Sequence, residues 1–259
     1  MDLKALIFDV DGTLADTERD GHRVAFNLAF ADAGLDWNWD VGLYGELLQT
    51  SGGKERMRRY LEDVRQAHKY KDADTLIPAL HAAKNRLYSE MLKQGKISLR
   101  PGVRRFLLEA RGAGLRLAIA TTTSRVNVVA LLKQTLQTDA PSWFEVIATA
   151  DEVPDKKPSP AVYEYVLKAM QLDSTQCLAF EDSENGLLAA QRAGIKTIIT
   201  VNDYTRNGDY SDALLVVSDF GEPGQPFEIL DGQAAKFITA QDGHVTVDLL
   251  RKLQRIEQQ

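Results

Sequence analysis

Near its start the chain reads Leu6-Ile7-Phe8-Asp9-Val10-Asp11-Gly12-Thr13-Leu14, and this stretch decides the fold. The short apolar run predicts a buried strand, and side chains two residues apart in a strand point the same way. Asp9 and Asp11 can therefore face one site, while Gly12 lets the backbone turn sharply and approach a ligand. Two carboxylates at a strand exit suit a hard cation such as Mg²⁺ and an accompanying phosphate. The alternative is a surface turn, which the adjoining apolar run disfavours.

The composition is that of a globular protein. The chain has 259 residues, more than a usual single domain, so one large or two unequal domains are expected. The net charge is −6 and no basic block occurs, which argues against a nucleic-acid partner. No apolar run approaches membrane-spanning length and the N-terminus is no signal peptide, so we expect no membrane partner and a cytoplasmic location. Cys177 is the only cysteine, which excludes an internal disulfide and a cysteine-based metal site.

The spacing of apolar residues divides the chain into two regions. Between the first strand, expected at residues 3–9, and Pro101-Gly102, only helices are predicted, at 17–33, 40–49, 53–69 and 74–94. Strands and helices then alternate, with strands expected at 115–121, 144–148, 177–180, 197–201 and 214–217, and helices at 103–112, 124–136, 159–170 and 183–193. A hairpin around Gln241-Asp242-Gly243 and a terminal helix are expected to follow.

This alternation predicts an α/β protein with a Rossmann-like parallel sheet. We expect a discontinuous catalytic core at 1–15 and 97–259, and a helical cap at 16–96 inserted after the first strand. Ligands bind at the carboxyl ends of the strands in such sheets, so Asp9 and Asp11 stand where a site is expected.

Three further polar groups stand at strand exits or just before helices. Thr121 and Thr122 offer hydroxyls for phosphate oxygens, although they could be an ordinary N-cap cluster. Lys157, before Pro158, could neutralise phosphate and carboxylate charge, although a lone Lys-Pro is usually a solvated loop. Glu181 and Asp182 follow another apolar run, and with Asp9 they would supply the oxygen ligands that Mg²⁺ requires.

Together these features resemble the four motifs of the haloacid-dehalogenase-like hydrolase superfamily. The motifs match Asp9–Thr13, Thr121, Lys157-Pro158 and Glu181-Asp182, in this order, and the resemblance covers nearly the whole chain. The resemblance implies that Asp9 attacks phosphorus to form an aspartyl-phosphate, and that Asp11 protonates the leaving alcohol and then activates water.

The same resemblance implies a metal set. Mg²⁺ would be bound by Asp9, by the backbone at Asp11 and by Asp182, with Glu181 either an outer ligand or a structural partner. Thr121 and Lys157 would hold the transferring phosphoryl oxygens.

The helical insert must supply substrate specificity, because the reaction at Asp9 does not select the leaving group. Glu18 and His22 lie four residues apart on one predicted helix face, and we expect them to contact sugar hydroxyls. Further along, Gly52 and Gly53 open a basic helix that carries Lys54 and Arg58, which predicts a second anion site. A solvated basic helix face is the alternative. Trp37, Trp39, Tyr44 and Tyr60 are expected to pack in the cap rather than to bind sugar.

Two phosphate sites imply a sugar bisphosphate or another phosphorylated sugar. Within the superfamily, the segments Asp16–His22 and Ser51–Arg56 look most like the CbbY-type proteins. That resemblance implies hydrolysis of xylulose-1,5-bisphosphate, an inhibitor of Rubisco, and a functional link to Rubisco in the Calvin cycle. It also implies a bacterial cytoplasmic or a chloroplast stromal location, and we expect a monomer.

Two other functions compete with this one. A sugar phosphomutase of the β-phosphoglucomutase type would use the same cap and aspartyl-phosphate. A non-catalytic, ligand-binding regulator would use the same fold, but the intact set Asp9, Asp11, Thr121, Lys157 and Asp182 disfavours it.

Overall fold

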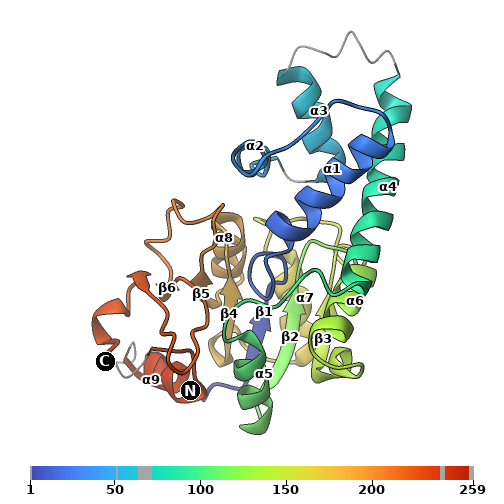
Figure 1. Cartoon of the computed structure of the whole chain (residues 1–259). Helices are drawn as coiled ribbons and strands as arrows, with labels where there is room; N and C mark the ends of the chain where they lie inside the picture. Colours follow the sequence, from blue (N-terminus) through green and yellow to red (C-terminus); the bar gives the residue numbers. More distant parts are fainter. Residues whose placement is uncertain (1, 51, 64–71, 240–242, 257–259) are drawn as a thin grey trace. The chain divides into compact units, whose positions relative to one another are not determined.

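The structure is a computed structural model that describes all residues except 1, 51, 64–71, 240–242 and 257–259. The chain forms two compact units (Figure 1). The core unit comprises Met1–Asp16 and Ser98–Gln259, and the inserted unit comprises Thr17–Ile97. Each unit has its own buried apolar residues, as expected of a separately packed unit.

The core unit is built on a seven-stranded sheet in the order β3-β2-β1-β4-β5-β6-β7. The strands are β1 (Ala5–Phe8), β2 (Arg116–Ala120), β3 (Phe144–Ala148), β4 (Cys177–Glu181), β5 (Lys196–Thr200), β6 (Leu215–Val217) and β7 (Ile229–Asp231). All neighbours are parallel except β6 and β7. Phe8 lies opposite Ile119 on β2 and Phe180 on β4. The carboxyl ends of the three central strands, β2, β1 and β4, therefore lie next to one another.

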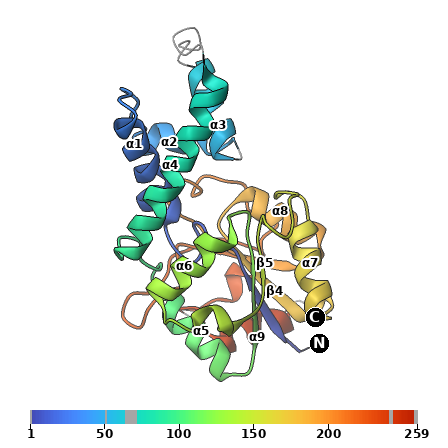
Figure 2. The same ribbon diagram turned by 90° about the vertical axis from the view of Figure 1, so that its right-hand side faces the viewer.

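Helices cover both faces of this sheet (Figure 2). Helices α5 (Val103–Gly112) and α6 (Arg125–Thr135) lie on one face, and α7 (Ala161–Met170) and α8 (Glu184–Arg192) on the other. Small strand residues allow α7 and α8 to pack closely, among them Ala5, Ala118 and Ala179. The opposite face carries stacked phenylalanines, with the rings of Phe8 and Phe180 5.0 Å apart. The α/β class and the mostly parallel sheet are confirmed.

In its described residues, the inserted unit contains a short π-helical turn and four α-helices. The turn spans Glu18–His22 and runs directly into α1 (Arg23–Asp32), followed by α2 (Val41–Leu47), α3 (Gly53–Asp63) and α4 (Ala73–Lys93). The predicted helix at 53–69 extends into residues 64–71, which lie outside the described part of the chain. As expected, Trp37, Trp39, Tyr44 and Tyr60 make ring contacts with one another or with Phe26 and Phe30. No described helix is both long and apolar enough to cross a membrane.

The C-terminal segment differs from the prediction. Residues 240–242 lie outside the described chain, but the predicted hairpin is not formed by the described residues on either side. Phe237, expected to begin the first strand, ends a 3₁₀ turn. Residues 244–246, expected in the second strand, form no strand and lead into helix α9 (Val247–Ile256). The backbone of 243–245 instead bonds to the loop at Phe220 and Phe227, which occupies its hydrogen-bonding groups. Strand β7 was not predicted from the sequence, while the terminal helix is confirmed.

The two pieces of the core unit meet again on either side of the insertion. Ala15 and Leu99 pair in an antiparallel bridge, and the Arg100 N–H donates to the Leu14 carbonyl at 3.0 Å. The first and second segments of the core are thereby joined next to the exit of β1.

Candidate active site

Asp9 and Lys157 form the centre of the site. Asp9 follows the last residue of β1, and its N–H donates to the Phe180 carbonyl of β4 at 3.0 Å. Its carboxylate is buried and accepts a hydrogen bond from Lys157 Nζ at 2.6 Å. Lys157 is also buried and donates to the Ala120 carbonyl at the end of β2, at 2.9 Å, and to Glu181. One lysine thus connects the exits of β1, β2 and β4.

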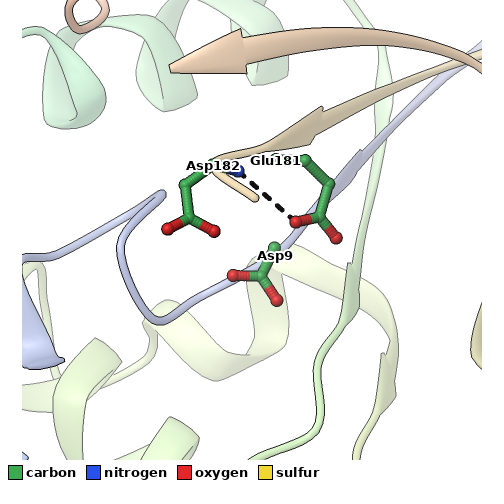
Figure 3. Close-up of side chains that lie close together, drawn as sticks. All are labelled: Asp9, Glu181 and Asp182. Atoms are coloured by element: carbon green, nitrogen blue, oxygen red, sulfur yellow. Dashed lines mark hydrogen bonds between the residues drawn. The ribbon is translucent and has the colours of Figure 1, made fainter. Parts of the chain in front are cut away.

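Two more carboxylates lie beside Asp9. Glu181 is the last residue of β4 and Asp182 the next, and both are buried. Ligand oxygens of Asp9, Glu181 and Asp182 lie within 4.8 Å of one another (Figure 3). Figure 3 also shows the Asp182 N–H donating to Glu181 Oε2, at 3.4 Å. Carboxylates packed so closely repel one another, and a divalent cation would relieve this repulsion.

The electrostatics reflect this crowding. Burial raises the pKa of Asp9 well above its usual range, although Lys157 opposes the shift. Burial, reinforced by the Glu181 charge, raises the pKa of Asp182 to about 7. Burial alone would lower the pKa of Lys157, but Asp9 and Glu181 outweigh it and hold the pKa above the usual range. The lysine is therefore a permanent cation beside the nucleophile predicted from the sequence.

Side chains that the sequence analysis did not single out support these groups. Tyr163 of α7 is buried and donates from its hydroxyl to Glu181 Oε1 at 2.5 Å. Asn202, just beyond β5, donates from Nδ2 to Asp182 Oδ2 at 2.7 Å. Gly12 has a φ of 88°, and a Cβ there would lie 2.3 Å from Asp182 Oδ2. A glycine is required at this turn for both its backbone conformation and its contact with Asp182.

The other predicted site residues of the core unit lie around the same strand exits. Thr121 is buried directly after β2, and its hydroxyl accepts from the Thr123 N–H at 3.3 Å. Thr122 is exposed next to it, and Asp11 is half-buried in the turn after β1. The positions fit the expected roles, which stay predictions.

In the inserted unit, Glu18 and His22 both have polar partners. Glu18 accepts a hydrogen bond from the Tyr44 hydroxyl at 2.5 Å, and that hydroxyl accepts from Arg56 Nη1 at 2.8 Å. His22 is buried, with its Nδ1 3.0 Å from Lys84 Nζ and its ring centroid 4.0 Å from that of Tyr88. Glu18 and His22 thus lie on one short π-helical turn but have different polar partners, Tyr44 for Glu18 and Lys84 for His22.

Helix α3 presents its basic residues on different faces. Lys54 and Arg58 are exposed, and Arg58 lies 3.8 Å from Asp74. Gly52 and Gly53 are half-buried at the helix start, and Gly52 has a φ of 98°. Arg56 is buried instead, and its Nε has no protein hydrogen-bond partner among the described residues. The apolar residues Met57 and Leu61 mark the buried face of this helix, and this signal could have identified Arg56.

The site combines a buried carboxylate that could act as a nucleophile, a lysine bonded to it, and an acidic cluster at the edge of a parallel sheet. This combination defines a phosphoryl-transfer enzyme of the α/β class. The sequence profile of the haloacid dehalogenase-like hydrolases matches residues 3–194. The chain belongs to this hydrolase family.

Several relatives resemble the chain over most of its length. It is 49% identical to "Protein CbbY" of Rhodobacter capsulatus over 213 residues, which are 82% of this chain and 92% of that protein. A plasmid-encoded CbbY of Cupriavidus necator is 48% identical over 226 residues, covering 86% of this chain and 88% of that protein.

Solved structures agree with these similarities. The crystal structure of CbbY from Rhodobacter sphaeroides in complex with phosphate has a TM-score of 0.75 and 40% identity, and covers 91% of this chain and 100% of that chain. A mutant of the same protein in complex with xylulose-1,5-bisphosphate gives a TM-score of 0.75 at 41% identity, over 90% and 98% of the two chains. A β-phosphoglucomutase from Clostridium difficile is 18% identical, with a TM-score of 0.69, and shares the fold.

Proposed function

We propose that the protein is a Mg²⁺-dependent sugar-bisphosphate phosphatase and that its substrate is xylulose-1,5-bisphosphate. The observation that carries the proposal is the bonded set of Asp9, Lys157 and Glu181 beside Asp182. Similarity to a CbbY structure that holds xylulose-1,5-bisphosphate supports the choice of substrate.

The acidic cluster fits the expected cation. Asp9 and Asp182 would bind Mg²⁺, with Glu181 at its edge and Asp11 contributing from the turn, because hard cations prefer oxygen ligands. When bound, the cation offsets the repulsion between the carboxylates and the incoming phosphate. Lys157 and Tyr163 both bond to Glu181 Oε1, which favours a supporting role for Glu181.

The side chains of the core unit suit a two-step transfer. Asp9 attacks phosphorus and the alcohol leaves, so that a mixed anhydride links Asp9 to the phosphoryl group. Asp11 donates the proton that the alcohol needs, and then takes a proton from the water that hydrolyses the anhydride. Lys157 keeps a positive charge next to Asp9, and the Thr121 hydroxyl can donate to a phosphoryl oxygen.

The inserted unit would recognise the rest of the sugar. Glu18 and His22 would contact hydroxyls, and Gly52, Gly53, Lys54 and Arg58 would offer an anion site. In the core unit, Thr122 would add a hydroxyl next to Thr121. Buried Arg56 and Lys84 add two cations in the inserted unit. Such cations favour a substrate with a second phosphate.

The test is product analysis with a panel of substrates. Purified protein and Mg²⁺ are incubated with xylulose-1,5-bisphosphate, ribulose-1,5-bisphosphate and glucose 1,6-bisphosphate. We expect stoichiometric inorganic phosphate and fastest turnover with xylulose-1,5-bisphosphate, and loss of turnover with a chelator. An isomerised monophosphate without phosphate release would instead establish the mutase, and tight binding without turnover a regulator.

The nucleophile can be tested by Asp9→Asn. The variant keeps the size of the side chain but removes the attacking charge, so we expect kcat to fall by at least about 10³-fold. Circular dichroism and thermal unfolding should show a folded protein. Activity within a few-fold of wild type would refute the role of Asp9.

The partners and location complete the proposal. We propose a monomer whose substrate links it functionally to Rubisco. Its relatives come from bacteria and from Arabidopsis thaliana, where a CBBY-like protein is 37% identical, which supports a bacterial cytoplasmic or a chloroplast stromal location. Gel filtration and fractionation of the source cells test these two points.

A further inference from the structure

Arg100 is a buried guanidinium at the point where the chain re-enters the core unit. It is 6% exposed and follows Leu99, which pairs with Ala15. Its Nη1 donates to the carbonyls of Gly12 and Thr200, the latter at 2.7 Å, and its Nη2 to the carbonyls of Val201 and Ser218, the latter at 2.7 Å. Its Nε lies 3.3 Å from Asp16 Oδ1. A planar guanidinium with five N–H donors can serve such a set of acceptors, and an ammonium cannot.

The four carbonyls lie at or just beyond the carboxyl ends of strands. Gly12 belongs to the turn after β1, Thr200 and Val201 to the exit of β5, and Ser218 to the exit of β6. Arg100 therefore links three loops at the functional edge of the sheet rather than bracing the interior of the sheet.

Two of these three loops, the turn after β1 and the loop after β5, lie against Asp182. Asn202 follows Val201 and donates to Asp182 Oδ2 at 2.7 Å. Gly12 approaches the same atoms so closely that a Cβ would lie 2.3 Å from Asp182 Oδ2 and 2.7 Å from Asn202 Nδ2. Arg100 thus bonds to the backbone on both sides of the Asn202–Asp182 pair.

We propose that Arg100 is a positioning residue for the cation site, which it orders by fixing the Gly12 turn against Asn202 and Asp182. This inference rests on the proposed function in one respect, the cation held by the acidic cluster. When a residue that orients a metal ligand is removed, the affinity for the metal typically falls by about 10- to 100-fold.

The test compares Arg100 with Arg105, a second arginine that bonds to loop carbonyls in the core unit. Arg105 donates to the carbonyls of Val245 and Gly221, at 2.9 and 3.0 Å, and to neither the Gly12 turn nor Asn202 among its described contacts. Arg100→Lys and Arg105→Lys keep the charge and remove the planar fork. Arg100→Met removes the charge as well.

Mn²⁺ alone serves as the probe, and its binding to the substrate-free protein is measured by electron paramagnetic resonance. We expect Arg100→Lys to weaken Mn²⁺ binding by about tenfold, and Arg105→Lys to change it less than about twofold. Hydrogen exchange of the metal-free protein should quicken in residues 10–15 and 200–203 for Arg100→Lys alone. In Arg100→Lys, saturating Mg²⁺ should restore most of the wild-type kcat.

Three results would overturn the inference. They are unchanged Mn²⁺ binding in Arg100→Lys, an equal loss in Arg105→Lys, and a wild-type protein that binds no Mn²⁺. A merely structural role would lower the melting temperature of both variants without a difference in Mn²⁺ binding. If wild type binds Mn²⁺ in an Arg100-dependent way but releases no phosphate from sugar bisphosphates, the proposed function fails and this inference stands.

Discussion

At the scale of single residues, the site depends on one shared carboxylate oxygen. Glu181 Oε1 accepts from both Lys157 and Tyr163, and Lys157 in turn bonds to Asp9. The hydroxyl of Tyr163 has no role in the chemistry proposed for Asp9. We expect this hydroxyl to hold Glu181, and through it Lys157, in place.

Removing that hydroxyl should therefore affect both stability and turnover. For Tyr163→Phe we expect a loss of about 1–3 kcal/mol in the free energy of unfolding, because a buried carboxylate loses a donor. We also expect kcat to fall while KM changes little. Urea unfolding and initial rates measure the two effects.

Tyr165→Phe is the matched control, because Tyr165 lies on the same helix and is 42% exposed. It should unfold and turn over like wild type. Equal behaviour of the two variants would contradict the role assigned to Tyr163.

At the scale of elements, the first turn of helix α8 packs directly against the Glu181 carboxylate at Gly186. A Cβ there would lie 1.9 Å from Glu181 Oε2 and 2.1 Å from Glu181 Cδ. We expect Gly186→Ala to displace Glu181, to lower the free energy of unfolding by about 1–3 kcal/mol and to reduce kcat.

The control is Gly112→Ala at the end of α5, where an added Cβ would meet nothing within 4 Å. There the same substitution should be neutral or slightly stabilising. Denaturant unfolding of both variants makes the comparison. A neutral Gly186→Ala would show that Glu181 can move without cost.

Helix α4 makes the inserted unit sensitive to acid through His81. Burial, with the Lys84 and Lys54 charges, lowers the pKa of His81 to about 4 from an ordinary value near 6.5. Between these pH values the unfolded chain binds a proton that the folded chain does not, so stability falls as the pH falls from 6.5 to 4.

Between pH 6.5 and 4, we expect the free energy of unfolding of His81→Gln to fall by about 1–2 kcal/mol less than that of wild type. This figure allows for solvent screening at a half-buried site. Tryptophan fluorescence during urea unfolding reports it, because Trp37 and Trp39 lie in the inserted unit. Wild-type and variant stabilities that run parallel from pH 7 to 4 would contradict it.

At the scale of the whole molecule, the core is continuous across the insertion. Ala15 pairs with Leu99, and the two units have separate buried interiors. A turn of about four residues is long enough to join antiparallel neighbours. We expect a core with residues 17–97 replaced by such a turn to fold on its own.

The shortened protein should unfold cooperatively in urea. It should hydrolyse a small aryl phosphate with Mg²⁺ and lose its preference for the sugar bisphosphate, because the specificity residues are gone. The full chain assayed in parallel is the control. A shortened core without a cooperative transition would show that the insert is needed for folding.

The sequence predicted the parts of the molecule that depend on local pattern. Asp9 and Glu181 follow apolar runs, and parallel strands bring their exits to one edge. Arg100, Tyr163 and Asn202 were missed because the partners that give them their roles lie far away in sequence. Strand β7 was missed because three exposed residues show no alternation.

The same limit applies to the inserted unit. Lys54 and Arg58 stand out as a spaced basic pair, but the helix buries Arg56 between them. The side chain of Arg56 is held by Tyr44 from another helix. The apolar pattern of α3 could have indicated that Arg56 is buried, but its partner Tyr44 is brought to it by the packing of α2 against α3.

The place of β1 in the sheet has a consequence for synthesis. This strand ends directly before Asp9, the proposed nucleophile, and it is synthesised before its two neighbours, residues 116–120 and 177–181. At about 5–20 residues per second, roughly 10–35 s separate the appearance of β1 and β4. During that interval the apolar run before Asp9 lacks the strand that covers one of its edges, so we expect aggregation during synthesis to be a risk for this segment.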